Sequence, residues 1–354
     1  MRGHSERAHH PDAEPTRSSA PRLDPAQLWP DDGAPPRLGR YEVLHKIGQG
    51  SHGVVFAGYD TQLQRPVALK VFADDRPERE VQREAVAMSA SRDVHVVALH
   101  DLDRVHGLSF LVMELINGPN VWQYMCSPGN DWRRAVLLFI QAAHGLAAVH
   151  RAGFAHGDVK PSNLLIGRND HVYVADFSIA EARELHPTAG AGEHVGSRDY
   201  QAPERLRGAS ANERTDQFSL CVSLWQTVFS CLPWASNDAQ IMRARAPVKL
   251  RRCVGSPRQL ERVLMRGLAV EPGDRFSSMD ELAAALTDLV IGRLERGQFS
   301  PTLRTVKKLA LGLGMRISGR AGRQTALAEL DAKDVPTPVP GARLGVIDVH
   351  EPAT

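Results

Sequence analysis

Short segments rich in hydrophobic residues, separated by glycine-rich or polar turns, begin at Tyr41. They predict β-strands over Tyr41–Ile47, Val54–Tyr59, Pro66–Phe72, Val96–Asp103 and Ser109–Leu115. A helix is predicted between the third and fourth strands. It begins near Pro77, because proline is tolerated in a first helical turn, and Val81, Ala85 and Met88 share one of its faces.

The hydrophobic spacing becomes helical after the break at Asn117-Gly118-Pro119. One helical stripe comprises Val136, Phe139, Ile140, Ala143, Ala147 and His150. Short strands are predicted over Asn163–Ile166 and His171–Ala175, and helices predominate from Asp216 to about Leu289. The pattern therefore predicts an α+β protein with two unlike lobes, residues 41–116 and 117–289, joined near Leu115–Asn120.

The two ends of the chain differ from this core. Residues 1–40 contain seven prolines and little hydrophobic periodicity, which indicates a disordered leader. Residues 290–354 are interpreted as a partly helical or disordered tail. Between Ile291 and Arg323 the tail has eight Lys or Arg residues and one acid, so it is a candidate basic amphipathic helix for an acidic partner, which could be regulatory, or for a membrane surface. The alternative is a solvated helix packed loosely on the second lobe.

The overall composition is that of a globular protein. Of the 354 residues, 42% are hydrophobic and 24% are charged, and the net charge of +2 gives no reason to expect a nucleic-acid partner. The four cysteines form no C-x-x-C motif, which favours free thiols in a reducing compartment. The sequence shows no signal peptide and no hydrophobic stretch of membrane-spanning length, so we expect a cytoplasmic protein without a transmembrane segment.

A glycine-rich turn lies between the first two predicted strands. It reads Gly48-Gln49-Gly50-Ser51-His52-Gly53, and glycines allow a backbone to approach phosphate oxygens closely. The G-x-G-x-x-G pattern alone also fits a dinucleotide site, which lies between a strand and a helix. Its position between two strands favours a flap over ATP.

Charged and amide side chains at defined positions complete a candidate phosphate site. Lys70 ends the third strand, and Glu84 in the next helix is its natural partner, so that Lys70 can hold nucleotide phosphates. In the segment His156–Asn163, Asp158 can orient a hydroxyl and accept its proton. Lys160 can neutralise phosphoryl charge, and Asn163 can bind a divalent metal.

A second metal-binding candidate follows the last predicted strand of this region. Asp176 begins the sequence Asp176-Phe177-Ser178, and a carboxylate at a strand end suits Mg²⁺ carried on substrate phosphates. Each motif alone has a neutral explanation, but all of them occur once, in order, within about 130 residues. This order indicates a phosphoryl-transfer enzyme that uses ATP and Mg²⁺, with Mn²⁺ as a substitute.

With these motifs the chain resembles the protein kinase family, and in particular bacterial serine/threonine kinases of the eukaryotic-like type, over about Tyr41 to Leu289. The segment Gly196–Glu204 resembles the end of an activation segment, with Thr188 and Ser197 as candidate phosphorylation sites. Asp216 resembles the aspartate of a buried central helix, and Arg275 resembles the arginine that pairs with Glu204. The resemblance implies a two-lobed fold and transfer of the γ-phosphoryl group of ATP to protein Ser or Thr in bacterial signalling.

The resemblance also implies individual roles. Met113 would be the gatekeeper, the backbone of Glu114 and Ile116 would bind adenine, and Met88, Leu99, His156 and Phe177 would form the regulatory spine. The implied ATP site comprises Ile47, Gly48, Gln49, Gly50, Ser51, His52, Gly53, Val55, Ala68, Lys70, Met113, Glu114, Ile116 and Leu165. Lys160 and Ser197 are typical of the Ser/Thr branch.

Two residues depart from the family pattern. Gly157 replaces the arginine that normally contacts a phosphorylated activation loop, so we expect activity without loop phosphorylation. Ser178 replaces a glycine that eases movement of the loop after Asp176. These departures leave a nucleotide-binding pseudokinase as an alternative. The His156-Gly157-Asp158 sequence also resembles small-molecule phosphotransferases, although Lys160, Glu204 and Arg275 favour a protein substrate.

Overall fold

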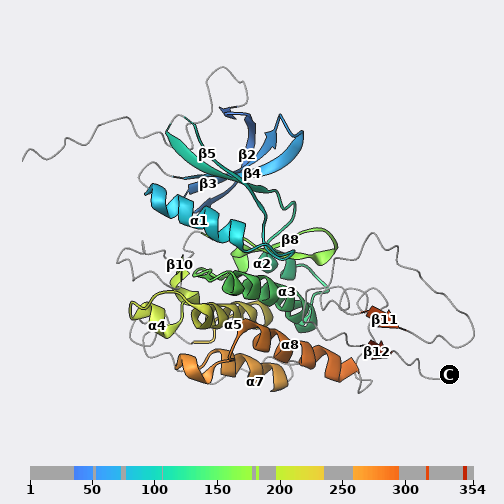
Figure 1. The fold of residues 1–354 in the computed structure, drawn as a ribbon. Helices are drawn as coiled ribbons and strands as arrows, with labels where there is room; N and C mark the ends of the chain where they lie inside the picture. The colour runs from blue at the N-terminus through green and yellow to red at the C-terminus, as the bar shows by residue number, and fades with distance from the viewer. Residues whose placement is uncertain are drawn as a thin grey trace, which may run out of the picture.

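The computed structural model describes residues 36–50, 53–72, 77–105, 107–177, 181–182, 197–234, 258–294, 316–318 and 346–348. Figure 1 shows a sheet-rich lobe with one helix, α1, placed above a larger lobe that is mainly helical. The predicted α+β class and the two unlike lobes are therefore confirmed. The chain passes between the lobes after β6 and before α2 (Figure 1).

The small lobe is built on an antiparallel sheet with the strand order β1-β2-β3-β4-β6-β5. The strands are β1 (Arg37–Leu38), β2 (Tyr41–Gly50), β3 (Gly53–Asp60), β4 (Arg65–Phe72), β5 (Leu99–Val105) and β6 (Leu108–Glu114). All five predicted strands are present. The predicted leader boundary at residue 40 is wrong, because Leu38 pairs with Tyr41 across a turn at Gly39 and is 1% exposed.

The two faces of this sheet bury different hydrophobic clusters, because successive side chains of a strand point to opposite faces. One face buries residues such as Phe56, Leu69 and Phe110 in a cluster confined to the small lobe. The other face contributes Ala68 and Met113 to the main core, which continues into the large lobe. Strand β4, which carries Lys70, is therefore packed against a hydrophobic cluster on each of its two faces.

Helix α1 (Glu78–Ala90) packs on the sheet and begins after Pro77, as predicted. Val81, Ala85 and Met88 are all buried, which confirms the predicted hydrophobic face. Glu84 lies between them in sequence and is also buried, at 2% exposed. A carboxylate in this position needs a charged partner, because an unpaired buried charge is costly.

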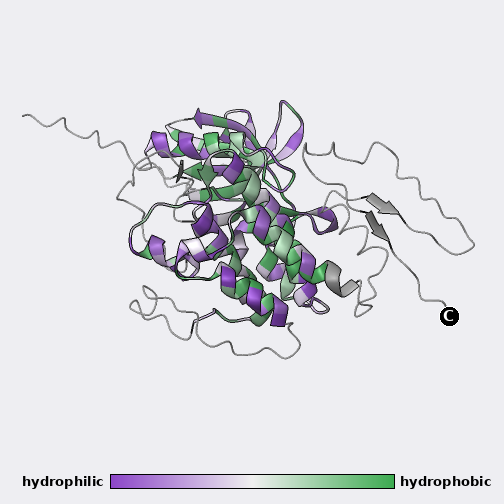
Figure 2. Ribbon diagram, turned by 60° about the horizontal axis from the view of Figure 1, so that its bottom comes forward, coloured by the Kyte–Doolittle hydropathy of each residue, from purple (hydrophilic) through white to green (hydrophobic). Residues whose placement is uncertain are grey.

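The large lobe contains α2 (Val121–Met125), α3 (Trp132–Arg151), α4 (Pro203–Leu206), α5 (Glu213–Phe229), α7 (Arg258–Gly267) and α8 (Met279–Leu294). Every member of the stripe predicted for α3 is buried. Helix α3 packs against α5 and α8, and the outer helices alternate between hydrophobic and hydrophilic segments (Figure 2). Among the described residues no helix has the length and hydrophobicity needed to cross a membrane.

Short elements connect the helices. The hairpin of β8 (Leu164–Ile166) and β9 (Val172–Val174) follows the turn η2 (Pro161–Asn163), and η3 (Arg168–Asp170) joins its strands. Strand β7 (Phe154–Ala155) pairs with β10 (Glu181–Ala182). The turns η4 (Ser197–Tyr200) and η5 (Pro272–Asp274) precede α4 and α8 respectively. The β8–β9 hairpin lies on the side of the large lobe nearest the sheet (Figure 1), with residues 156–163 just before it and residue 176 just after it in the chain.

The C-terminal boundary also differs from the prediction. Helix α8 ends at Leu294 rather than Leu289. Within the tail, β11 (Arg316–Ser318) and β12 (Val346–Asp348) form a parallel pair, where helix or disorder was predicted. Most of the basic segment between Ile291 and Arg323 lies outside the described residues.

Gly145 in α3 allows the helix to approach the segment that joins α1 to β5. A Cβ atom on Gly145 would lie 2.6 Å from the carbonyl oxygen of His95. We expect Gly145→Ala to lower the free energy of unfolding by about 1–2 kcal/mol, because overpacking outweighs the gain of about 1 kcal/mol in helix propensity. Urea denaturation checks this. Gly273→Ala, which meets nothing within 4 Å, should leave stability unchanged, and equal stabilities of the two variants would contradict the expectation.

Candidate active site

Lys70 lies between two carboxylates that come from different lobes. Its Nζ atom is 2.6 Å from Oε1 of Glu84 on α1 and 2.5 Å from Oδ1 of Asp176, which follows β9. Lys70 and Glu84 are buried, whereas the side chain of Asp176 is 39% exposed. The predicted Lys70–Glu84 pair is therefore confirmed. The contact with Asp176 joins the small lobe to the large lobe.

The charges of this triad stabilise one another. Burial acts to lower the pKa of Lys70, but Asp176 and Glu84 outweigh it and raise that pKa above its ordinary value. For Asp176, burial acts to raise the pKa, and the Lys70 ammonium outweighs it and lowers the pKa well below the ordinary range. Asp176 is thus a carboxylate, the form that can bind a metal ion.

The loop from His156 to Asn163 holds a second group of polar side chains. The Lys160 Nζ atom lies 2.7 Å from Oδ2 of Asp158. The amide nitrogen of Asn163 donates to the backbone carbonyl of Asp158 at 2.9 Å, which fixes the orientation of the amide. The Asn163 Oδ1 atom then faces away from this bond. The three side chains predicted to act together are therefore brought together.

Asp216 on α5 holds this loop by hydrogen bonds to its backbone. Its carboxylate accepts hydrogen bonds from the backbone N–H groups of His156 and Gly157, each at 2.8 Å, and lies 2.8 Å from Nε2 of His150. Burial opposes ionisation of Asp216, but the bond to His150 and the other contacts outweigh it and lower the pKa of the carboxyl. Gly157 adopts φ +79°, a conformation that favours glycine.

The residues predicted to surround adenine lie on neighbouring strands. Ala68 is directly opposite Met113 on β6, and Val55 is opposite Lys70, so these side chains share one face of the sheet. Leu165 on β8 bridges Asn120 at the start of α2, just after the connection between the lobes. Glu114 and Ile116 are partly exposed in that connection.

The glycine-rich turn joins β2 to β3, as predicted. Gly48 pairs with Val55, and Gly50 pairs with Gly53 at the end of the hairpin, with Gln49 between them opposite Val54. Gly53 has φ +151°, and a Cβ atom there would lie 2.1 Å from the carbonyl oxygen of Val71. Ile47 is 47% exposed. Ser51 and His52 lie outside the described residues.

The residues of the predicted spine converge on the main core. The rings of His156 and Phe177 are 5.0 Å apart, and both side chains are fully buried. Met88 belongs to the same core as Phe177, and Leu99 packs against it. Of the two candidate phosphorylation sites, Thr188 lies outside the described residues and Ser197 begins η4. Ser178, which departs from the family pattern, also lies outside them.

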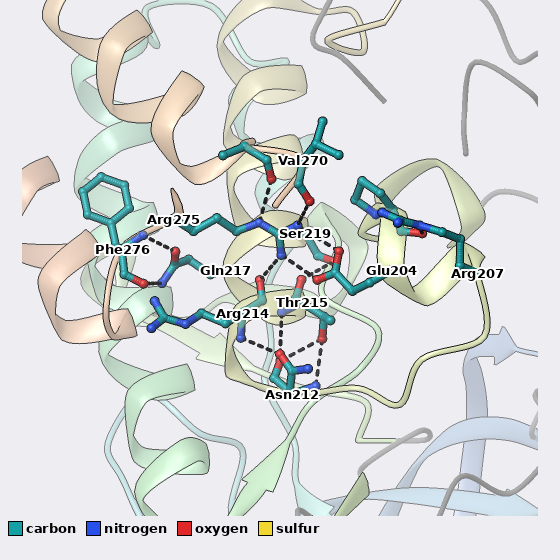
Figure 3. A network of polar contacts seen from close by, with 12 residues as sticks. Glu204, Arg207, Asn212, Arg214, Thr215, Gln217, Ser219, Val270, Arg275 and Phe276 are labelled. Carbon is teal, nitrogen blue, oxygen red and sulfur yellow. Dashed lines mark hydrogen bonds and ion pairs between the residues drawn. The ribbon is translucent and has the colours of Figure 1, made fainter. Parts of the chain in front are cut away.

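The predicted pair of Glu204 and Arg275 forms the centre of a polar network beneath α4 (Figure 3). Two guanidinium nitrogens of Arg275 bind the two carboxylate oxygens of Glu204 at 2.7 and 2.8 Å. Three further hydrogen bonds reach the backbone carbonyls of Arg214, Ala269 and Val270. Figure 3 also shows Gln217 bound to the backbone of Phe276, at 2.9 and 3.2 Å.

Sequence reasoning did not predict two features of this site. One is the contact of Lys70 with Asp176, which joins residues 106 positions apart. The other is the pair of hydrogen bonds from the backbone of His156 and Gly157 to Asp216, which was assigned only to a buried helix. The ordering of polar residues along the chain indicated which motifs belong together, but no local pattern indicates which charges touch.

Comparison with known proteins agrees with this geometry. Residues 41–285 match the protein kinase domain. This chain belongs to the protein kinase family. Among curated relatives of this kinase, the serine/threonine-protein kinase PknD of Mycobacterium tuberculosis is 31% identical over 308 residues, which cover 82% of this chain and 46% of PknD.

Two further relatives of the kinase carry similar names. Serine/threonine-protein kinase PknE of Mycobacterium tuberculosis is 32% identical over 259 residues, or 70% of this chain and 46% of PknE. Serine/threonine-protein kinase PknH of Mycobacterium bovis is 32% identical over 259 residues, or 70% of this chain and 44% of PknH. The kinase thus spans about half the length of the relatives that it matches.

Proposed function

We propose that this protein kinase transfers the γ-phosphoryl group of ATP to Ser or Thr hydroxyls of other proteins. The observation that carries this proposal is the contact of Lys70 with both Glu84 and Asp176, facing a loop in which Asp158, Lys160 and Asn163 are held together. In kinases this arrangement positions the triphosphate and the incoming hydroxyl. The names of the relatives support protein Ser/Thr as the acceptor.

The residues present fit a magnesium ion carried on the nucleotide phosphates. Mg²⁺ prefers oxygen ligands, and the site offers the Asp176 carboxylate and the Asn163 Oδ1 atom, whose amide nitrogen is already bound to Asp158. When bound, the ion would neutralise phosphate charge. Lys70 is held by Glu84 and would position the α and β phosphates.

Asp158 would orient the acceptor hydroxyl and take its proton late in the reaction. Lys160 lies 2.7 Å from Asp158 and would stabilise charge on the transferred group. Most of the acceleration would come from positioning and electrostatic stabilisation. The segment from η4 to α4, braced by Glu204 and Arg275, would support the bound substrate protein.

A transfer assay tests this proposal. The purified kinase is incubated with γ-labelled ATP, Mg²⁺ and a generic basic protein. Label should appear on protein with the wild type and should be absent with Lys70→Met. Binding of nucleotide without any transfer of label would contradict the proposed activity and favour the pseudokinase.

We also propose that activity does not require phosphorylation of the activation segment. Gly157 has no side chain to contact a phosphate, and its φ of +79° favours glycine over arginine. Thr188→Ala should therefore keep kcat within about twofold of the wild-type value, since no charge-assisted contact is lost. Steady-state kinetics measure this, with Thr188→Glu as a charged comparison. A tenfold or larger loss in Thr188→Ala would contradict the proposal.

A further inference from the structure

The segment between α1 and β5 pairs with β9 of the large lobe. Val96 forms a parallel bridge with Val174. The Val97 N–H group donates to the carbonyl of Val174 at 3.0 Å, and the Val174 N–H group donates to the carbonyl of His95 at 2.8 Å. This segment follows the helix that carries Glu84, and β9 ends two residues before Asp176. The junction therefore links the two carboxylates that contact Lys70.

Two histidine side chains, one from each segment, bind backbone carbonyls across this junction. The Nδ1 atom of His95 lies 3.0 Å from the carbonyl oxygen of Val172, and the Nε2 atom of His171 lies 2.6 Å from the carbonyl oxygen of Val94. A carbonyl only accepts hydrogen bonds, so each of these nitrogens carries a proton. The rings are stacked, with centroids 4.5 Å apart and planes 19° apart.

Few charges are available to offset a positive charge on these rings. His95 is 6% exposed, and the Asp93 carboxylate accepts its backbone N–H at 2.9 Å. His144 on α3 is close enough to act on the charge of His95, and Asp280, Asp93 and Arg151 act on His144 in turn. The Tyr173 ring, 4.7 Å away, meets the edge of His171. Burial first, and His171 second, lower the pKa of His95 to about 4.

We propose that His95 and His171 form an acid-sensitive clamp that keeps β9, and with it Asp176, docked against the small lobe. With one proton each, both rings bind a carbonyl on the opposite segment and stack on one another. Full protonation of His95 places a positive charge in a buried position, because His95 is 6% exposed, with the His171 ring stacked 4.5 Å away. Opening the junction lets water hydrate this charge. The clamp itself does not depend on the proposed function, and only the importance given to the position of Asp176 rests on it.

The direction of the pH effect follows from the pKa of His95. Its value in the folded protein, about 4, is below the value of 6.5 for an exposed histidine. The closed junction therefore binds fewer protons than the open one between these values, and acid favours opening. The clamp is fully stable above pH 6.5 and weakens progressively as the pH falls from 6.5 towards 4.

Hydrogen exchange of the Val97 and Val174 amides tests the clamp without nucleotide or substrate, so its result does not depend on the proposed activity. In the wild type, the opening constant, corrected for intrinsic exchange, should rise on the order of tenfold from pH 7 to pH 5. His171→Gln keeps a donor for the Val94 carbonyl but removes the ring that stacks on His95 and helps to lower its pKa, so it should show a smaller rise. The double variant His95→Gln/His171→Gln should show none.

His45→Gln is the matched control, because His45 lies exposed on β2, far along the sheet from the junction. It should keep the wild-type pH dependence. A wild-type opening constant that does not change with pH would overturn the proposal. An opening constant that rises as steeply in His171→Gln as in the wild type would also overturn the proposal. This comparison needs only the single variant, so it remains decisive if the double variant does not fold.

Discussion

Asp158→Asn should lower kcat by about 10²–10⁴-fold while affinity for nucleotide stays close to the wild-type value. Asparagine has nearly the same shape and can keep a contact with Lys160, but it cannot accept the proton of the acceptor hydroxyl, and general-base catalysis contributes about this factor. The loss should appear in kcat rather than in the KM for ATP, because Lys70 and Asp176 are unchanged and the Asn163 amide keeps its shorter bond to the backbone carbonyl of residue 158. Steady-state kinetics and a separate measurement of nucleotide binding distinguish these effects.

Asp101→Asn provides the control for this variant. Asp101 lies on β5, where its carboxylate binds Arg40 and the Tyr41 hydroxyl, away from the Lys70 triad. The same change of carboxylate to amide at this position should leave kcat unaltered. If Asp158→Asn kept more than about a tenth of the wild-type kcat, Asp158 would not be the base, and the proposed mechanism would lose its central residue.

Arg275→Met should lower the free energy of unfolding by about 3–5 kcal/mol. The substitution removes five hydrogen bonds and leaves the Glu204 carboxylate, 14% exposed, without its cation. The cost of an uncompensated buried charge exceeds what methionine gains by packing against the Phe218 ring, over which the guanidinium now lies. Urea denaturation gives the loss directly.

Arg151→Met makes the same substitution in an exposed ion pair. Arg151 contacts Asp280 at 3.3 Å, with both side chains 57% exposed, and such pairs contribute less than about 1 kcal/mol. Similar losses in Arg151→Met and Arg275→Met would mean that the network of Figure 3 does not brace the large lobe. If Arg275→Met yields no folded protein, Glu204→Gln gives a milder test of the same pair.

Much of the fold could be predicted because its local patterns are strong. The hydrophobic runs between turns in residues 41–72 predict the central strands, and the faces of α1 and α3 follow from residues three and four apart, such as Val81, Ala85 and Met88. Strand β1 was missed because two residues are too few to show a period, and prolines before it indicated a leader.

The sequence predicts which residues belong to the candidate site better than it predicts which of them are in contact. Lys70 and Glu84 were paired from the sequence because a lysine at the end of a hydrophobic strand needs a partner unless it is exposed, and Glu84 lies in the next helix. The stack of His95 and His171 joins residues on different lobes, and neither histidine belongs to a recognisable motif. Contacts of this kind depend on how β9 docks against the small lobe, which hydrophobic periodicity does not encode.

The most direct test of the proposed activity is phosphoamino-acid analysis of protein labelled by the purified kinase with γ-labelled ATP and Mg²⁺. Acid hydrolysis of the labelled protein should release phosphoserine or phosphothreonine, and Asp158→Asn should give little or no label under the same conditions. Two results would contradict the account. One is nucleotide binding with no label on protein, and the other is label that enters only a small molecule.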